Sequence, residues 1–325
     1  MKARIGFLLG AALILGLFGV YGRTFRTYHE LSTTLLAMGG VEIEVKAYGA
    51  NRRAFAQAVS EIEARFRGLE ARLTRFRPTS DIGRINAAAG GGPVEVHEDT
   101  LRVLLQAQRV AESSQRAFDV SVLPLLQLWK DAAKGQREPT DQEIASALAR
   151  VDAARIVIDS AHRTVQIPGG MAVDLGGIGQ GLFADEGVRI LRAHGILRGL
   201  VNASGEVAVF DDRPQPEPFA IGILDPRTGG QGGVVRLVRG AVATSGSYRR
   251  GVEVSGRHRS HILDPLSGRP ADGTLSVTVE GPSALEADAW STACAVLASR
   301  GMDPRPFLPP GFRLHALVSA DPSRP

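Results

Sequence analysis

Apolar and polar positions along the chain follow two periods, which together predict a mixture of strands and helices. Residues 41–48 alternate apolar and polar side chains, which predicts a strand that ends at Gly49. Further along, apolar side chains recur at spacings of three and four residues, which predicts an amphipathic helix that Pro78 stops. The apolar side of this helix is formed by Ile62, Phe66, Leu69, Leu73 and Phe76.

The same reasoning places the other elements. Residues 79–81 are expected to form a polar turn, and the proline-rich segment 211–218 a surface loop between strands rather than a domain boundary. The predicted helices cover 99–114 with Asp99 as the cap, the segment after a capping box at Thr140 and Glu143, 182–191 and 284–299. The predicted strands cover 156–158, 164–167, 199–201, 207–210, 219–224 and 234–238, so strands dominate the middle of the chain.

The first 26 residues are typical of an export or membrane address. Lys2 and Arg4 precede an uncharged apolar run, 5–21, which is the pattern of a signal peptide. This run is slightly short for a transmembrane helix, which needs about 20 residues. Two arginines just beyond it disfavour export, so a cleaved signal peptide and an uncleaved anchor both stay open. No cysteine follows the run, which excludes a lipoprotein anchor.

Composition and charge describe a globular, formally neutral protein beyond this leader. The chain of 325 residues is 44% apolar and 22% charged, with a net charge of +4 from 38 basic and 34 acidic residues. Residues 1–26 hold four basic side chains and no acidic one, so 34 of each sign remain and a general affinity for nucleic acid is not expected. The single cysteine, Cys294, cannot form an intramolecular disulfide and is expected in the core.

Several common catalytic motifs are missing, which removes large classes of enzyme. The chain has no P-loop, no H-E-x-x-H and no G-x-S-x-G sequence. The glycine-rich run 176–181 fails the G-x-G-x-x-G spacing because Leu182 stands at the last glycine position. This run lies between a strand and a helix, where its N–H groups could approach a phosphate, but a tight structural turn explains it equally well.

Two further features could carry chemistry. Asp288 and Thr292 are four residues apart in the last helix, so their oxygens share one face, and such hard ligands suit Mg²⁺ bound together with substrate phosphates. A solvated helix surface is the alternative explanation. His258 and His261 would point to opposite faces of an extended segment, which argues against a shared metal and leaves His261 as a structural or a catalytic side chain.

Taken in order, eight segments of the chain resemble the ApbE family, the FAD:protein FMN transferases. The resemblance extends from Met38 to about Arg300 and implies an α+β fold with T-fold-like antiparallel sheets and packed helices over 31–325. The segments are Met38-Gly39, 74–86, 117–121 with Pro124 and Trp129, 174–181, Val201-Asn202, 243–246, 260–270, and 285–289 with Thr292.

The resemblance also implies roles for individual residues. Asp288 and His261 would be catalytic, with His261 as the base near the acceptor hydroxyl. The FAD site would be lined by Met38, Phe76, Ala117, Phe118, Asp119, Asp174, Gln180 and Ile262. Mg²⁺ would be held by the Gly177 carbonyl and by Asp288, Ser291 and Thr292.

The implied reaction cleaves the pyrophosphate of FAD and transfers FMN to a Thr or Ser hydroxyl of a redox protein, with release of AMP. The expected partners are FAD and an acceptor flavoprotein of membrane or periplasmic electron transfer. The expected location is the periplasm, or the inner membrane facing it. A FAD pyrophosphatase and a non-catalytic flavin carrier or assembly factor remain alternatives. Many relatives carry Lys in place of Gln180, Thr in place of Gly40 and Gly in place of Ser204.

Overall fold

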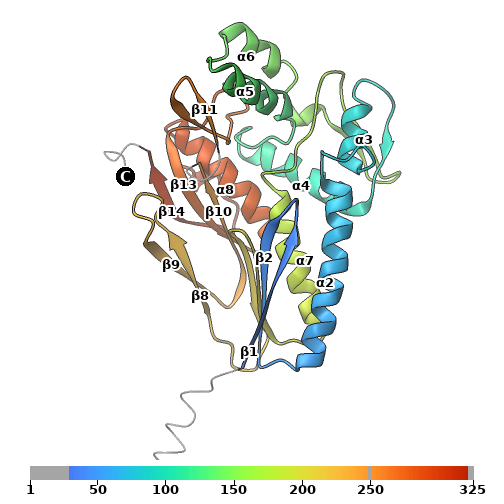
Figure 1. Cartoon of the computed structure of the whole chain (residues 1–325), viewed down its shortest axis with the longest axis vertical. Coiled ribbons are helices and arrows are strands. Elements are labelled where there is room, and N and C mark those ends of the chain that lie inside the picture. The colour runs from blue at the N-terminus through green and yellow to red at the C-terminus, as the bar shows by residue number, and fades with distance from the viewer. Residues whose placement is uncertain (1–28, 248–250, 321–325) are drawn as a thin grey trace, which may run out of the picture.

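A seven-stranded antiparallel sheet forms the centre of the molecule (Figure 1). The computed structural model describes residues 29–247 and 251–320, so the predicted leader, 1–26, lies outside the described residues. Among the described helices, none has the length and apolar character that a membrane span requires. The strands of the sheet, in spatial order, are β1 (Glu30–Ala37), β2 (Val41–Tyr48), β6 (Arg198–Ala203), β7 (Glu206–Asp211), β10 (Arg239–Gly246), β13 (Thr274–Gly281) and β14 (Arg313–Ser319).

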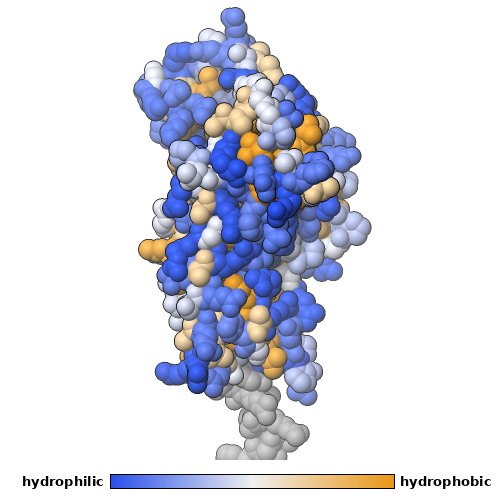
Figure 2. Space-filling view, turned by 90° about the vertical axis from the view of Figure 1, so that its right-hand side faces the viewer, coloured by the Kyte–Doolittle hydropathy of each residue, from blue (hydrophilic) through white to orange (hydrophobic). Residues whose placement is uncertain are grey.

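One face of this sheet is covered by three long helices. They are α2 (Arg52–Leu73), α7 (Gly179–Ala193) and α8 (Ala284–Ser299). The interface holds the main hydrophobic core, which includes Phe66, Phe183 and Trp290. Cys294 is fully buried in α8, and burial raises the pKa of its thiol to about 12. The face of the molecule that carries α2 and α3 is mostly hydrophilic, with apolar residues in small patches (Figure 2).

The opposite face of the sheet is covered in part by a separate two-stranded ribbon, β8 (Phe219–Leu224) and β9 (Gln231–Leu237). Residues of β7 alternate between the two faces, so Val207 and Val209 pack against the ribbon while Ala208 and Phe210 belong to the main core.

The remaining elements build a smaller part at one end of the molecule (Figure 1). They are α3 (Asp81–Ala87), β3 (Val94–Glu95), α4 (Glu98–Ser113), α5 (Leu123–Gly135), α6 (Asp141–Leu148), η1 (Ala153–Arg155), β4 (Val157–Asp159), β5 (Thr164–Gln166), β11 (Gly251–Val254) and β12 (Arg257–Ser260). A last short turn, η2 (Arg305–Phe307), precedes β14.

The α+β fold with antiparallel sheets is confirmed, and so are the strand at 41–48, the Thr140 capping box and the helix at 284–299. The first predicted helix is too long, because α2 ends at Leu73 and Phe76 lies outside it with 75% of its surface exposed. The predicted polar turn is present at residues 79 and 80, but Asp81 already belongs to α3, and the Ser80 hydroxyl caps this helix by accepting the Gly83 N–H at 2.9 Å. Asp99 does not cap α4, since His97 occupies that position.

Helices α7 and α8 cross at Gly181 and cap each other. A Cβ atom at Gly181 would overlap the backbone of Ala284, so only glycine permits this approach. The Asp185 carboxylate on α7 accepts the N–H groups of Ala284 and Leu285, at 2.8 and 3.0 Å, at the start of α8. In return, the Asp288 carboxylate on α8 accepts the Gly181 N–H at 3.1 Å, in the first turn of α7. Each helix therefore satisfies N-terminal donors of the other.

Replacement of Gly181 by alanine tests this crossing. We expect Gly181→Ala to lower the free energy of unfolding by about 3 kcal/mol or more, because the new methyl group meets backbone that cannot move aside cheaply. Urea denaturation followed by circular dichroism measures the effect. The matched control is Gly179→Ala, whose Cβ would lie 3.9 Å from that of Leu175, an ordinary contact. Equal stability of the two variants would contradict the tight crossing.

Candidate functional site

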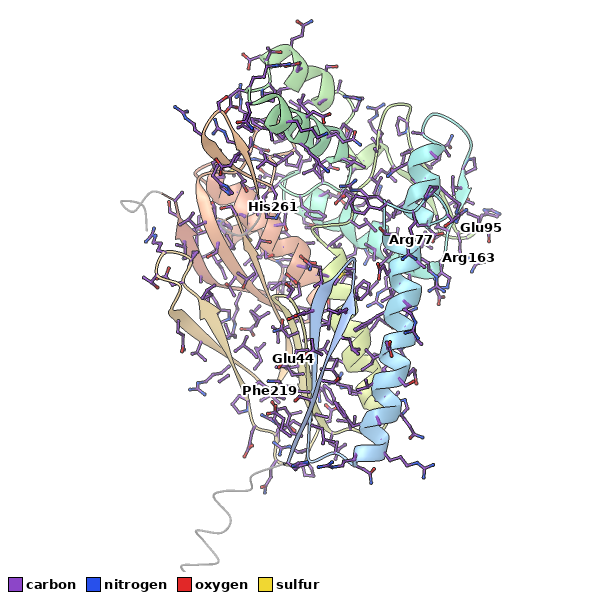
Figure 3. The ribbon with its side chains drawn as sticks, viewed as in Figure 1. Glu44, Arg77, Glu95, Arg163, Phe219 and His261 are labelled. Carbon is purple, nitrogen blue, oxygen red and sulfur yellow. The ribbon has the colours of Figure 1, made fainter. Side chains whose placement is uncertain are left out.

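One cavity of about 910 Å³ lies between the sheet, the β8–β9 ribbon and the N-terminal ends of α7 and α8. This volume falls in the range of sites that enclose cofactor-sized ligands. Figure 3 shows Glu44 and Phe219 toward one end of the molecule and His261 toward the other; all three line the cavity. The predicted site residues that line it are Ala117, Phe118, Asp119, Asp174, Gly177, Gln180, His261, Ile262, Asp288 and Thr292.

Three predicted residues do not line the cavity. Met38 lies in the turn between β1 and β2, where its N–H donates to Glu70 Oε2 at 3.1 Å. Phe76 is exposed, and the Arg75 guanidinium lies 4.1 Å from the centre of its ring. Ser291 is fully buried behind the cavity wall. Their assigned roles remain predictions of the family resemblance.

The glycine run brings backbone close to α8 and to Phe118. At Gly177, a Cβ atom would lie 3.3 Å from Phe118 Cε2 and 3.4 Å from Thr292 Oγ1. Four of the six N–H groups in 176–181 already have partners within the protein: Gly176, Ile178, Gly179 and Gly181 donate to Asp174 Oδ1, the Leu175 carbonyl (twice) and Asp288 Oδ2. Fewer N–H groups are therefore available to bind a phosphate than the number of glycines suggests.

Asp174 is fixed at the entrance to this run from three sides. Asn86 of α3 exchanges two hydrogen bonds with the Val173 backbone, at 2.7 and 2.9 Å, and the Asp174 N–H donates to the Val120 carbonyl at 2.8 Å. The carboxylate itself forms an ion pair with Arg75. Two residues of the 74–86 segment therefore hold Asp174 in place, Arg75 through the ion pair and Asn86 through the Val173 backbone.

A cluster of oxygens forms where α8 meets β10. Ser245 Oγ lies 2.7 Å from Ser291 Oγ and 3.0 Å from Thr292 Oγ1. Ser291 Oγ donates in turn to the Asp288 carbonyl at 2.8 Å, so it positions Ser245 from behind. Asp288 is only 4% exposed, yet it borders the cavity together with Thr292 and Ser245.

This cluster fits a hard divalent cation. One carboxylate and several neutral oxygens are donors that Mg²⁺ accepts, with water and substrate phosphates completing its shell. Among the described residues, no group of three or more His, Cys, Asp or Glu side chains is arranged to hold a metal alone. The donor set therefore suits a metal that arrives with a phosphate ligand, and less well a zinc-type site.

The Asp119 carboxylate has a structural use. It accepts the N–H and hydroxyl of Ser121, at 2.7 and 2.6 Å, and the Ala153 N–H at 2.9 Å. Burial raises the pKa of this carboxyl, and these hydrogen bonds oppose the rise. Asp119 thus shapes the loop that presents Ala117 and Phe118 to the cavity.

His261 and Ile262 lie on a loop that is tied down behind the cavity. The Ile262 carbonyl accepts the Ala271 N–H at 2.8 Å, and the Trp129 indole N–H donates to the Gly268 carbonyl at 2.8 Å. The Arg300 guanidinium holds Asp264 through two hydrogen bonds, the shorter 2.6 Å, so the loop is fixed while the exposed His261 imidazole reaches the cavity. His258, in contrast, contacts Glu253 and the Ser247 carbonyl, and it does not line the cavity.

Reasoning from the sequence missed several cavity residues. Ser245 belongs to the 243–246 segment, so the family pattern held a signal for it, whereas no sequence pattern pointed to Lys46, Arg198 or the buried Glu206. Arg198 lies 3.8 Å from the centre of the Phe219 ring and also forms an ion pair with Asp211. These residues come from separate strands and meet only in the folded sheet.

An α+β domain with a cofactor-sized cavity, a glycine turn and a carboxylate–hydroxyl cluster has groups that suit a phosphate-bearing ligand. The sequence model of the ApbE family matches residues 39–303, and the chain belongs to this family. The FAD:protein FMN transferase of Salmonella typhimurium is 31% identical over 265 residues, which cover 79% of this chain and 75% of the relative. That of Treponema pallidum is 33% identical over 257 residues, covering 74% and 71%.

Solved structures give the same assignment. The ApbE protein of Thermotoga maritima superposes with a TM-score of 0.80 at 30% identity, covering 90% of this chain and 94% of that one. The flavinyl transferase ApbE of Pseudomonas stutzeri, in its apo form, gives a TM-score of 0.71 at 29% identity, covering 83% and 85%. The family resemblance drawn from the sequence is confirmed.

The α7–α8 cap predicts a pH dependence of stability. Burial raises the pKa of the Asp185 carboxyl to about 6, although the two N–H groups that it accepts oppose the rise. Between pH 4 and pH 6 the folded state holds a proton that the unfolded state has lost, so stability falls as the pH rises. From pH 4 to pH 7 we expect the unfolding free energy of the wild type to fall by on the order of 2 kcal/mol relative to that of Asp185→Asn. Urea denaturation at both pH values measures it; a constant difference would contradict the raised pKa.

Proposed function

We propose that this protein, a flavin transferase of the ApbE family, attaches FMN through a phosphoester to a Thr or Ser of an acceptor protein and releases AMP. In this reaction the acceptor oxygen bonds to the FMN phosphorus of FAD. The bond from that phosphorus to the bridging oxygen breaks, and the bridging oxygen leaves with AMP. The hydroxyl proton passes to a base or to water. The main task of the protein is alignment of these three groups.

The observation that carries this proposal is the oxygen cluster of Asp288, Thr292 and Ser245 beside the Gly177 turn. Asp288, Ser291, Thr292 and the Gly177 carbonyl would hold Mg²⁺. When bound, the metal neutralises negative charge on the phosphate oxygens. The Gly181 N–H fixes one oxygen of Asp288, and Ser245 fixes the Thr292 hydroxyl, so both ligands are oriented before substrate arrives.

The cavity walls suit the other parts of FAD. Phe118, Ala117 and Ile262 are buried apolar side chains that offer contact to flat rings. Asp174 and Gln180 supply polar groups between them, while Met38 and Phe76 would contact the ligand from outside the cavity. His261 lines the cavity, and it would accept the proton of the acceptor hydroxyl as a neutral imidazole.

The leader, 1–26, supports a location in the periplasm or on the inner membrane facing it, where exported or membrane redox proteins would serve as acceptors. The formally neutral remainder of the chain gives no support to a nucleic-acid partner. Protease accessibility in cells that produce the full chain measures this location, and protection by an intact inner membrane would count against it.

Substitution of Asp288 tests the reaction directly. The protein is mixed with FAD, MgCl₂ and a periplasmic or membrane extract, and mass spectrometry searches for Thr or Ser peptides heavier by one FMN. We expect Asp288→Asn, which keeps a side-chain acceptor for the Gly181 N–H, to reduce adduct formation and AMP release by a factor of about 100 or more, because a charged metal ligand is lost. Asp131→Asn, at an exposed site on α5, is the matched control.

The outcomes separate the candidate functions. AMP release without any protein adduct would identify a FAD pyrophosphatase instead. FAD binding without AMP release under any condition would identify a carrier or assembly factor. If the Asp288→Asn variant were as active as the wild type, the oxygen cluster would have no role in the reaction.

Gln180 offers a second test, because many relatives carry lysine at this position. Gln180 borders the cavity next to the glycine turn, where a cation would face the pyrophosphate. We expect Gln180→Lys to lower the Kd for FAD by about three- to tenfold, with a larger effect at low ionic strength. Fluorescence quenching of FAD measures the Kd. Gln180→Met, of similar length and without charge, is the control; equal effects of both substitutions would show that charge is not the cause.

A further inference from the structure

The outer edge of β8 forms one wall of the cavity. All six residues of the strand, Phe219 to Leu224, line it, while no residue of β9 does. Phe219, Ile221 and Ile223 face the sheet and pack on it, whereas Ala220 and Gly222 face away and are exposed. Successive side chains of a strand point to opposite faces. Because the cavity is lined by residues of both faces, it lies beside the edge of β8.

This edge carries hydrogen-bonding groups that no strand of the described chain pairs. β8 pairs only with β9 in a two-stranded sheet. The Asp225 N–H donates to the Gly230 carbonyl at 2.8 Å and the Asp225 carbonyl accepts the Gly229 N–H at 2.9 Å, so the backbone groups of Asp225 point toward β9. The one irregularity in the pairing skips Gly232 of β9, so the alternation along β8 continues and the backbone groups of Leu224, Gly222 and Ala220 point to the cavity.

The cavity is continuous from this edge to the oxygen cluster at Asp288 and Thr292. Its floor beside β8 is the face of the central sheet, which presents Lys46 and Glu44, paired at 2.9 Å, together with Leu200. Arg198 also lines this part of the cavity and forms an ion pair with Asp211, so the floor mixes apolar groups with charges that are paired within the protein. Such a surface suits a polypeptide segment better than it would suit another negatively charged ligand beside FAD.

We propose that an extended segment of the acceptor protein adds to the outer edge of β8 as a third strand, which leads its hydroxyl side chain to the Asp288–Thr292 end of the cavity. The inference rests on the proposed transferase function and names where its protein substrate binds. Main-chain hydrogen bonds would supply sequence-tolerant affinity, as in other cases of strand addition to an exposed edge. The FAD would occupy the part of the cavity around Phe118 and Asp174, next to Asp288 and Thr292.

Hydrogen exchange tests the strand addition. The probe is a library of 15-residue peptides, each with one central threonine, incubated with the full protein, FAD and MgCl₂. We expect FMN adducts on a subset of peptides, and those peptides should slow amide exchange at Gly222 and Leu224 about tenfold. Exchange at Ile221 and Ile223, whose N–H groups face β9 by the same alternation, should change far less.

A proline in β8 gives an independent test. Gly222 has no positive φ, and a Cβ atom added to it would meet open space, so proline would remove the N–H without a clash at Cβ. We expect Gly222→Pro to lower kcat/KM for the modified peptides by about tenfold, and Gly222→Ala, which keeps the N–H, to retain most of it. FAD binding of each variant is measured first as a check of folding.

Three results would overturn the inference. One is peptide modification without protection of β8 together with full activity of Gly222→Pro. Another is an equal loss of activity in Gly222→Ala, which would point to steric crowding. The third is modification of a folded acceptor protein but of no peptide in the library. Absence of AMP release and of adducts in every arm would instead overturn the transferase function, and the inference with it.

Discussion

The crossing of α7 and α8 at Gly181 is the constraint on which the site depends. Asp185 and Asp288 each cap the helix that the other belongs to, so the two helices are joined by carboxylates at both sides of one close contact. This arrangement holds the first turn of α7 against α8, and Thr292 next to Gly177. The residue with the strongest claim to catalysis is therefore also a structural cap. A substitution at Asp288 must keep an acceptor for the Gly181 N–H if its effect on chemistry is to be separated from its effect on folding.

The glycine run owes its composition more to packing than to phosphate binding. Gly181 is required because the Ala284 backbone leaves no room for a side chain, and a Cβ atom at Gly177 would crowd Phe118 and Thr292. Most N–H groups of the run are already used within the protein, so few remain for a substrate oxygen. In the proposed reaction the pyrophosphate would then be held mainly by a metal at the oxygen cluster and by side chains, so a lysine at position 180 would strengthen the binding of FAD.

Much of the fold was predictable because its elements have strong local signals, such as the alternation at 41–48 and the Thr140 capping box. The prediction failed where tertiary contacts decide: Phe76 fits the helical spacing, but α2 ends before it and leaves the ring exposed. The same limit applies to the site. Most of its predicted residues line the cavity, but the resemblance that named them gave no physical reason for their position. Lys46 and Arg198 read in the sequence as ordinary surface charges, and strand order, which no local pattern encodes, brings them to one cavity.

The charge distribution and the cavity shape lead to a common account of how two very different substrates share one site. Beyond the leader the chain is formally neutral, so no broad positive field attracts FAD, and local groups must select it. These groups gather at the end of the cavity formed by the α7–α8 crossing. The other end combines a strand edge that no described strand pairs with the paired charges of Lys46 and Glu44, and the proposed acceptor segment would bond to this edge. Asp288 and Thr292 lie at the crossing end, where a phosphoryl group of FAD and a hydroxyl led in from the strand edge would meet.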